Sequence, residues 1–208
     1  MPKSAAATER GVKHLSRADP VLKEVIRRAG PFTLKPRTNR FQSLVYSILS
    51  QQISTKAADA IRRKFLDLVG GPARLTPEIV STLSVKHLRA AGLSKQKASY
   101  ILDLANRVRS GTLPLNRIAR MSNDEVIATL IEVKGIGEWT AHMFLMFQLG
   151  RLDVWPTGDF GVRNGYSKMY GLPEMLTPKV LEAAGEPFRP YRSIVAWWCW
   201  RAADTVTL

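Results

Sequence analysis

A tight glycine turn between two helical segments constrains the fold of this chain more than any other feature. Gly135 and Gly137 flank a single residue, and glycine suits such a joint because it permits positive φ and lets another backbone approach closely. Upstream, residues 122–125 read Ser-Asn-Asp-Glu, the Ser-x-x-Glu form of a capping box, which predicts a helix start. Downstream, residues 139–149 are apolar on almost every face, which predicts a buried helix.

Two helices joined in this way form a helix–hairpin–helix, whose second helix offers unpaired amides and the positive end of its dipole to an anion. A nucleic-acid phosphate held there would be positioned without any sequence being read. A plain turn between packed helices is the alternative. The charge balance favours the phosphate, because Lys+Arg 31 against Asp+Glu 17 gives a net charge of +14. That charge favours a polyanionic partner without choosing among DNA, RNA and an anionic membrane.

The rest of the chain shows helical periodicity, and no segment alternates with the period of a strand. Caps and glycine stops predict helices at residues 20–30, 41–49, 55–68, 85–91, 94–109, 160–170, 177–184 and 191–203, besides the hairpin at about 124–149. An all-α fold is therefore expected, as one compact unit or as two lobes that share a groove. Residues 1–15 are expected to form a flexible basic tail, followed by a helical domain over 16–208.

Several classes of protein are disfavoured by composition. The nearly apolar runs are too short to cross a bilayer, and the N-terminus lacks the apolar stretch of a secretory signal. Cys199 is the single cysteine, so neither an internal disulfide nor a four-cysteine iron–sulfur cluster can form. We interpret it as a buried small hydrophobic residue. No histidine has a second ligand type at metal spacing, so no metal site is expected.

A carboxylate follows the hairpin on a loop, in Pro156-Thr157-Gly158-Asp159. Taken alone, Asp159 is typical of a helix N-cap. Asp153, slightly upstream, is a rival carboxylate, and spacing does not choose between the two.

Three segments together resemble the helix–hairpin–helix (HhH-GPD) superfamily of DNA glycosylases, and within it the DNA-3-methyladenine glycosylase II branch: Ile48–Ser54, Leu130–Ala141 and Asp153–Asp159. The similarity runs from about Phe41 to Arg201 and includes Gly92–Lys97 and Arg189–Ser193. It implies two helical lobes that flank a groove. An N-terminal β-rich domain found in the best-known bacterial member has no counterpart in the roughly forty residues before the similar region.

The resemblance assigns roles to matching positions. Asp159 takes the place of the catalytic aspartate, and Trp139 stands where bifunctional members carry a Schiff-base lysine, so no strand-cleaving lyase activity is expected. Gln52 stands where related enzymes insert a residue into the gap left by an extruded nucleotide; a helix-end glutamine bonded to backbone is the alternative.

Alkylated purines carry positive charge, which aromatic faces attract. Candidates for the base pocket are Trp139, Phe160, Trp155 and Trp197, although simple core packing is the alternative, above all for the cluster 197–200. Expected DNA contacts are Gln52, Lys134, Gly135, Gly137, Thr140, Lys97 and Arg192. No cofactor is required, but the resemblance allows a monovalent cation on hairpin carbonyls such as Ile131, Val133 and Ile136.

The expected function is a monofunctional glycosylase that flips alkylated purines, such as 3-methyladenine and 7-methylguanine, out of double-stranded DNA and hydrolyses the N-glycosidic bond in base-excision repair. The alternatives are a glycosylase of the same fold for deaminated or oxidised bases, and a non-enzymatic DNA-binding module. A monomer without membrane association is expected, in the bacterial cytoplasm at the nucleoid or in a eukaryotic nucleus.

Overall fold

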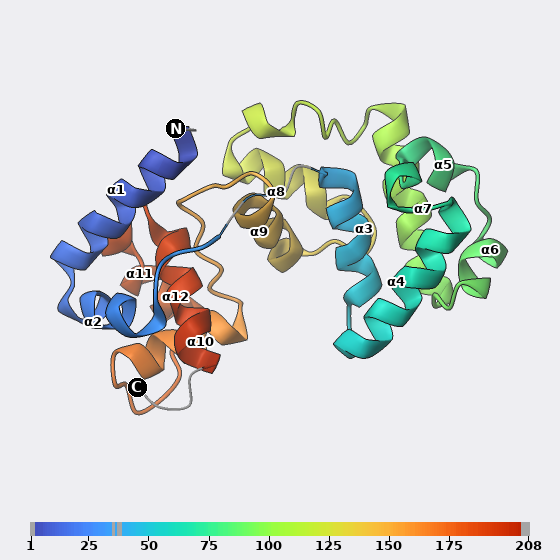
Figure 1. The fold of residues 1–208 in the computed structure, drawn as a ribbon. Helices are drawn as coiled ribbons and strands as arrows, with labels where there is room; N and C mark the ends of the chain where they lie inside the picture. Colours follow the sequence, from blue (N-terminus) through green and yellow to red (C-terminus); the bar gives the residue numbers. More distant parts are fainter. Residues whose placement is uncertain (1–2, 35, 37–38, 205–208) are drawn as a thin grey trace. The chain divides into compact units, whose positions relative to one another are not determined.

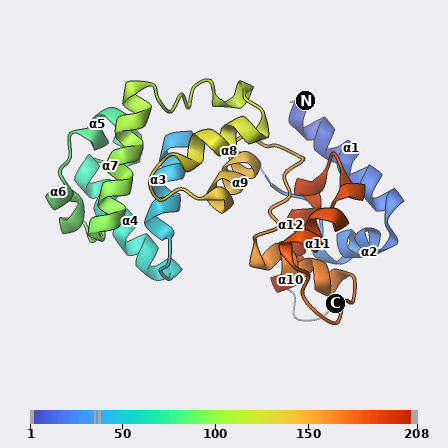
Figure 2. The same ribbon diagram turned by 180° about the vertical axis from the view of Figure 1, so that it is seen from behind.

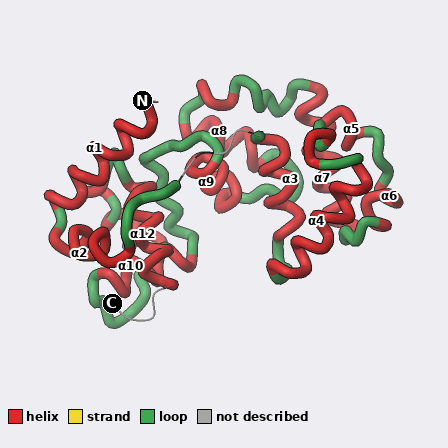
Figure 3. Tube along the Cα trace, in the orientation of Figure 1, coloured by secondary structure: helices red, strands yellow, loops and turns green. Residues whose placement is uncertain are grey.

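The computed structural model describes residues 3–34, 36 and 39–204, and these form α-helices and short 3-10 helices without any strand (Figures 1 and 3). The predicted all-α fold is confirmed. The chain divides into two compact units. Unit 1 takes the residues up to Pro36 and from Leu145 onward, and unit 2 runs from Arg37 to Phe144.

Unit 2 carries the glycine turn. Its helices are α3 (Arg40–Ser50), α4 (Thr55–Val69), α5 (Pro77–Ser81), α6 (Val85–Ala90), α7 (Lys95–Ser110), α8 (Asn123–Ile131) and the first part of α9 (Glu138–Phe147). Helix α7 packs against α3, α5 and α6. The predicted caps at Ser94 and Ser122 are confirmed, because each hydroxyl accepts a hydrogen bond from an amide in the first turn of its helix. Leucine, isoleucine and phenylalanine side chains from three helices form its core: Leu44, Ile48, Phe65, Ile101 and Leu104.

Unit 1 combines the two ends of the chain. Its helices are α1 (Lys3–Ala18), α2 (Pro20–Ala29), α10 (Phe160–Met169), α11 (Pro178–Ala184) and α12 (Arg192–Asp204). Helices α10 and α12 lie side by side (Figures 1 and 2). The predicted start of α2 is confirmed, since the Asp19 carboxylate accepts hydrogen bonds from the Val21 and Leu22 amides at 2.8 and 3.0 Å. Residues 194–199 of α12 are buried, and the Cys199 thiol lies among them, as predicted.

The expected loose tail over residues 1–15 is wrong for the described residues, because residues 3–18 form α1. Leu15 is buried, and a Cβ added to Gly11 would lie 2.7 Å from Ile194 of α12. His14 also contacts the ring of Tyr191, with centroids 5.7 Å apart. Apolar contacts with α2 and α12 therefore hold α1 in the fold of unit 1.

None of the helices in the described part of the chain is long and apolar enough to cross a membrane. No group of three or more His, Cys, Asp or Glu side chains that could hold a metal ion occurs among the described residues either.

Candidate active site

The Asp159 carboxylate caps helix α10 in unit 1. Its Oδ1 accepts hydrogen bonds from the Val162 amide at 2.7 Å and from the Trp200 indole Nε1 at 2.8 Å. Asp159 is only 9% exposed, so both donors hold a largely buried oxygen. The expected N-cap is confirmed, and the indole contact fixes the orientation of the carboxylate from a second helix, α12.

Two glycines of α10 let Trp200 come this close. A Cβ on Gly161 would lie 2.7 Å from Trp200 Cδ1 and 3.2 Å from Asp159 Oδ1. A Cβ on Gly165 would overlap the Cys199 carbonyl oxygen of α12. Phe147 stacks on Trp200, with ring centroids 5.8 Å apart and planes inclined by 26°. Close packing of helices therefore fixes the donor that holds Asp159.

The loop before Asp159 is anchored by a tryptophan. Trp155 is 5% exposed, its Nε1 donates to the Leu181 carbonyl at 2.8 Å, and its ring meets Phe188 edge to face. The Asp159 amide closes the turn by donating to the Pro156 carbonyl at 2.9 Å. Trp155 was a candidate for the base pocket, and the structure gives it packing partners in the core of unit 1.

Asp153, the rival carboxylate, is part of an ion-pair network. Its Oδ1 lies 2.6 Å from Arg192 Nε, and its Oδ2 lies 2.8 Å from Arg189 Nη1. The Arg192 side chain is only 8% exposed and also contacts Glu182 and Glu186. Hydrogen bonding by Arg189 lowers the pKa of the Glu186 carboxyl. Arg192 was expected to reach a phosphate, but here its guanidinium is buried against carboxylates.

The remaining aromatic candidates differ in exposure. Phe160, directly after Asp159, is 67% exposed, and Trp139, in the first turn of α9, is 51% exposed. Trp197 is buried in unit 1, where Phe32 meets it edge to face with centroids 5.2 Å apart. Phe160 in unit 1 and Trp139 in unit 2 thus offer ring faces, and Trp155 and Trp197 serve the core.

The hairpin of unit 2 lies between α8 and α9. Gly135 has φ +81°, and the ring of Tyr100 fills the space where its Cβ would be. Gly137 has no protein atom within 4 Å of such a Cβ and does not have positive φ. The two predicted glycines therefore differ: Gly135 meets a conformational need, and Gly137 leaves open space beside the first-turn amides of α9. Thr140 in that turn is buried.

Lys134 precedes the turn with an exposed side chain, and its amide donates to Asp103 Oδ2 at 3.0 Å. The Val133 carbonyl accepts a hydrogen bond from the Ile136 amide at 3.0 Å.

Gln52 occupies an exposed turn after α3. It has φ +56°, the one positive φ of a residue other than glycine in the described ranges. The adjacent Gln51 donates from Nε2 to the Gly135 carbonyl at 2.8 Å. Lys97 was expected to contact phosphate, but its Nζ donates to the Leu49 and Gln51 carbonyls at 2.7 and 2.6 Å.

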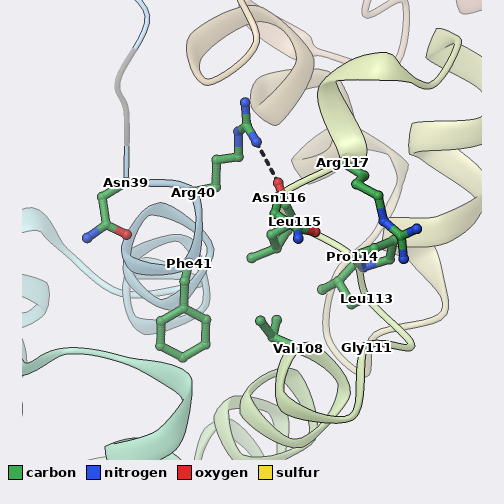
Figure 4. Close-up of a pocket in the computed structure, with 10 residues that line it drawn as sticks. All are labelled: Asn39, Arg40, Phe41, Val108, Gly111, Leu113, Pro114, Leu115, Asn116 and Arg117. Carbon is green, nitrogen blue, oxygen red and sulfur yellow. Dashed lines mark hydrogen bonds between the residues drawn. The ribbon is translucent and has the colours of Figure 1, made fainter.

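Two hollows lined by described residues lie away from Asp159. Figure 4 shows one of about 700 Å³ in unit 2, where Arg40 Nη1 donates to the Leu115 carbonyl at 2.5 Å. Its other lining residues are Asn39, Phe41, Val108, Gly111, Leu113, Pro114, Asn116 and Arg117. None of them is a carboxylate. A second hollow, of about 890 Å³, lies in unit 1 between α1 and residues 30–34 and Pro36. Asp159 lines neither of them.

Comparison with known proteins identifies the family. The profile of the HhH-GPD superfamily of base excision DNA repair proteins matches residues 45–190. DNA-3-methyladenine glycosylase 1 of Schizosaccharomyces pombe is 33% identical over 194 residues, covering 91% of this chain and 85% of the relative. This chain belongs to the HhH-GPD superfamily.

Solved structures agree with this assignment. A crystal structure of a DNA-3-methyladenine glycosidase from Bacillus halodurans aligns with TM-score 0.86 and 41% identity, over 94% of this chain and 89% of that one. A 3-methyladenine DNA glycosylase of S. pombe in complex with abasic DNA aligns with TM-score 0.80 and 31% identity, over 95% and 98% of the two chains.

Sequence reasoning missed residues that touch the proposed site residues of this HhH-GPD chain. Trp200 was assigned to an aromatic core cluster, and nothing near it in sequence signals its hydrogen bond to Asp159. Tyr100 and Asp103 lie on a helix whose start was predicted, but their contacts with the hairpin join segments about thirty positions apart. The spacing of three between Lys97, Tyr100 and Asp103 on α7 is a sequence signal that could have found them.

Proposed function

We propose that this protein is a monofunctional DNA glycosylase that extrudes an alkylated purine from duplex DNA and hydrolyses its N-glycosidic bond, which begins base-excision repair. The observation that carries the proposal is the buried Asp159 carboxylate, held by two hydrogen-bond donors in a chain of the HhH-GPD superfamily. Relatives named for 3-methyladenine support the substrate class.

Asp159 supplies negative charge to the reaction. Departure of the base leaves positive charge on the sugar, and a carboxylate near the anomeric carbon stabilises that transition state. The same group can orient or deprotonate the attacking water. Because the Trp200 and Val162 donors share one oxygen, the carboxylate keeps a single orientation and needs no rearrangement during the reaction.

The proposed lack of lyase activity rests on Trp139, which stands where bifunctional members of the superfamily carry a Schiff-base lysine. An indole cannot form a Schiff base with the sugar, so the product is an abasic site with an intact backbone. Trp139 is 51% exposed and Phe160 67%, and an exposed ring face can stack on an electron-poor alkylated base. Phe160 in unit 1 and Trp139 in unit 2 each remain a candidate for a base contact, since Trp155 and Trp197 are packed in the core of unit 1.

DNA is held by the hairpin. The first-turn amides of α9 lie at the positive end of the helix dipole and suit one phosphate, and Gly137 leaves room for the DNA backbone. Thr140 and Lys134 belong to the same proposed phosphate-binding site. We call this site, made of the first-turn amides of α9 with Gly137, Thr140 and Lys134, the phosphate grip. Gln52, on its exposed turn, enters the stack in place of the extruded nucleotide.

The remaining proposals concern partners and location. The partner is double-stranded DNA with damaged bases, bound by a monomer in the bacterial cytoplasm at the nucleoid, or in the nucleus of a eukaryote. No cofactor enters the reaction. A monovalent cation on the carbonyls of Ile131, Val133 and Ile136 would strengthen the grip, so replacing potassium by choline should weaken DNA binding.

Base release from methylated DNA tests the function, with Asp159→Asn as the decisive variant and Asp67→Asn, an exposed carboxylate on α4, as the matched control. Wild type and control should release 3-methyladenine and 7-methylguanine and leave the strand uncut. Asp159→Asn should slow release by about 10²- to 10⁴-fold and still bind an abasic-site analogue.

Three results would contradict the proposal. Undiminished release by Asp159→Asn removes that carboxylate from the mechanism. Release of only deaminated or oxidised bases from a lesion panel reassigns the substrate. Saturable binding without release of any base identifies a DNA-binding module.

A further inference from the structure

One face of helix α7 contacts both segments that are proposed to touch DNA. Lys97, Tyr100 and Asp103 follow one another at a spacing of three, which places them along one side of the helix. Lys97 contacts the turn that carries Gln52, and the other two contact the hairpin. All of these residues belong to unit 2.

Lys97 caps the C-terminal end of α3. The last carbonyls of a helix lack partners within it, and the ammonium group donates to two carbonyls at that end, those of Leu49 and Gln51. Partial burial lowers the pKa of Lys97. These two bonds hold the main chain on both sides of Ser50, immediately before Gln52 adopts φ +56°.

Asp103 and Tyr100 hold the hairpin from the same helix. Asp103 Oδ2 accepts from the Lys134 amide at 3.0 Å and from Arg107 Nε at 3.1 Å. The Tyr100 ring lies against Gly135. These contacts fix the main chain of the turn without using the side chain of any residue in it.

Gln51 then joins the two segments directly. Its main-chain carbonyl accepts from Lys97, and its side-chain Nε2 donates to the Gly135 carbonyl at 2.8 Å. Helix α7, the Gln52 turn and the hairpin therefore form a closed set of contacts. A shift of the turn relative to the hairpin would break either this bond or the Lys97 cap.

We propose that Lys97 and Gln51 are positioning residues that hold the Gln52 turn in fixed register with the phosphate grip of the hairpin. The inference rests on the proposed function. In this proposal Lys97 binds main-chain carbonyls of the protein and does not contact a DNA phosphate. Gln52 must meet the stack at a fixed distance from the gripped phosphate, so a loose turn slows extrusion of the nucleotide, whereas cleavage after extrusion depends on Asp159.

The test compares Lys97→Met with Lys95→Met, which removes the same charge from an exposed position on the same helix. Single-turnover release of 7-methylguanine is measured from a duplex with cytosine opposite the lesion and from one with mispaired thymine. Extrusion is easier from the mismatch, because less pairing energy is lost.

Lys97→Met should slow release from the paired lesion by about 10- to 100-fold and from the mispaired lesion by much less. Gln51→Leu should shift the ratio of the two rates in the same direction. Lys95→Met should keep the wild-type ratio. Equal slowing on both duplexes, or a wild-type ratio in the Lys97 and Gln51 variants, would overturn the inference.

Two further measurements keep the outcome decisive. If Lys97→Met does not fold, Lys97→Gln keeps a shorter, uncharged NH2 donor group and should give an intermediate ratio; a wild-type ratio would overturn the inference. Fluorescence of 2-aminopurine opposite a tetrahydrofuran abasic analogue reports insertion of Gln52 without catalysis, and the Lys97 variants should diminish its change on binding. Failure of wild type to release any base counts against the proposed function, whereas unchanged fluorescence in the variants counts against this inference.

Discussion

The two units hold their proposed functional groups by different means. In unit 1, Asp159 is fixed because α10 and α12 approach closely enough to bring Trp200 to its carboxylate. In unit 2, the hairpin and the Gln52 turn are fixed by side chains that bond to main-chain atoms. Close packing tolerates no added volume, whereas polar bonds to the main chain can be removed one at a time. Changes in unit 1 should therefore affect folding and catalysis together, and many changes in unit 2 should affect function alone.

The largest expected effect tests the packing of unit 1. Gly165→Ala places a Cβ on the Cys199 carbonyl oxygen, so α10 and α12 must separate. The free energy of unfolding should fall by about 3 kcal/mol, measured by urea denaturation. Gly158→Ala is the control for stability, because its Cβ would meet no atom within 4 Å. Equal stability of the two variants would refute close packing as the support of Asp159.

A second substitution tests the two glycines of the hairpin. Gly135→Ala adds a Cβ at φ +81° and against the Tyr100 ring, and should lower the free energy of unfolding by about 2 kcal/mol. Gly137→Ala meets no protein atom, so stability should change by less than about 0.5 kcal/mol. DNA binding, measured by fluorescence anisotropy, should nevertheless weaken in Gly137→Ala. Unchanged affinity would remove Gly137 from the grip.

A smaller effect is expected when the indole donor is lost. Trp200→Phe keeps a ring beside Phe147 but removes the hydrogen bond to Asp159 Oδ1. Base release should slow by about ten-fold in single-turnover assays, because one charge-assisted bond no longer orients the carboxylate. Affinity for an abasic analogue should stay the same. An unaltered rate would show that the Val162 amide suffices to hold Asp159.

The smallest effect concerns the capping box before the hairpin. Hydrogen bonds from the Ser122 amide and side chain lower the pKa of Glu125 from 4.5, so its ionised form contributes stability above that pH. The contribution is lost as the pH falls through the lowered folded pKa. Thermal melts of wild type and Glu125→Gln should thus differ slightly at neutral pH and converge in acid. A difference that persists in acid would exclude charge as its source.

Local signals in the sequence predicted the helices well. Asp19, Ser94 and Ser122 cap helices because each side chain accepts a hydrogen bond from an amide in the first turn of the helix that follows it. These bonds need no partner from a distant part of the chain. The glycine turn was equally readable. Helix α1 was missed, since Gly11 meets Ile194 of α12 at the other end of the chain, and local sequence does not signal that contact.

Roles of charged side chains were less predictable. Lys97 and Arg192 lie beside loops, which favours phosphate contacts, yet their partners are internal and separated by 46 and 39 positions from Gln51 and Asp153. The sequence shows that Lys97 and Arg192 are positively charged. Their partners, however, depend on which distant segments the fold brings together. Asp159 was selected over Asp153 through family resemblance, and the ion pairs of Asp153 supply a physical reason for that choice.

The burial of Cys199 bears on how this protein withstands alkylating agents. An agent that methylates purines also attacks sulfur, and the thiolate is the form that reacts. Burial raises the pKa of the Cys199 thiol and keeps it out of contact with solvent, while α10 covers the adjoining main chain. Because this is the chain's single cysteine, the protein presents no thiol to the very electrophiles whose products it is proposed to remove.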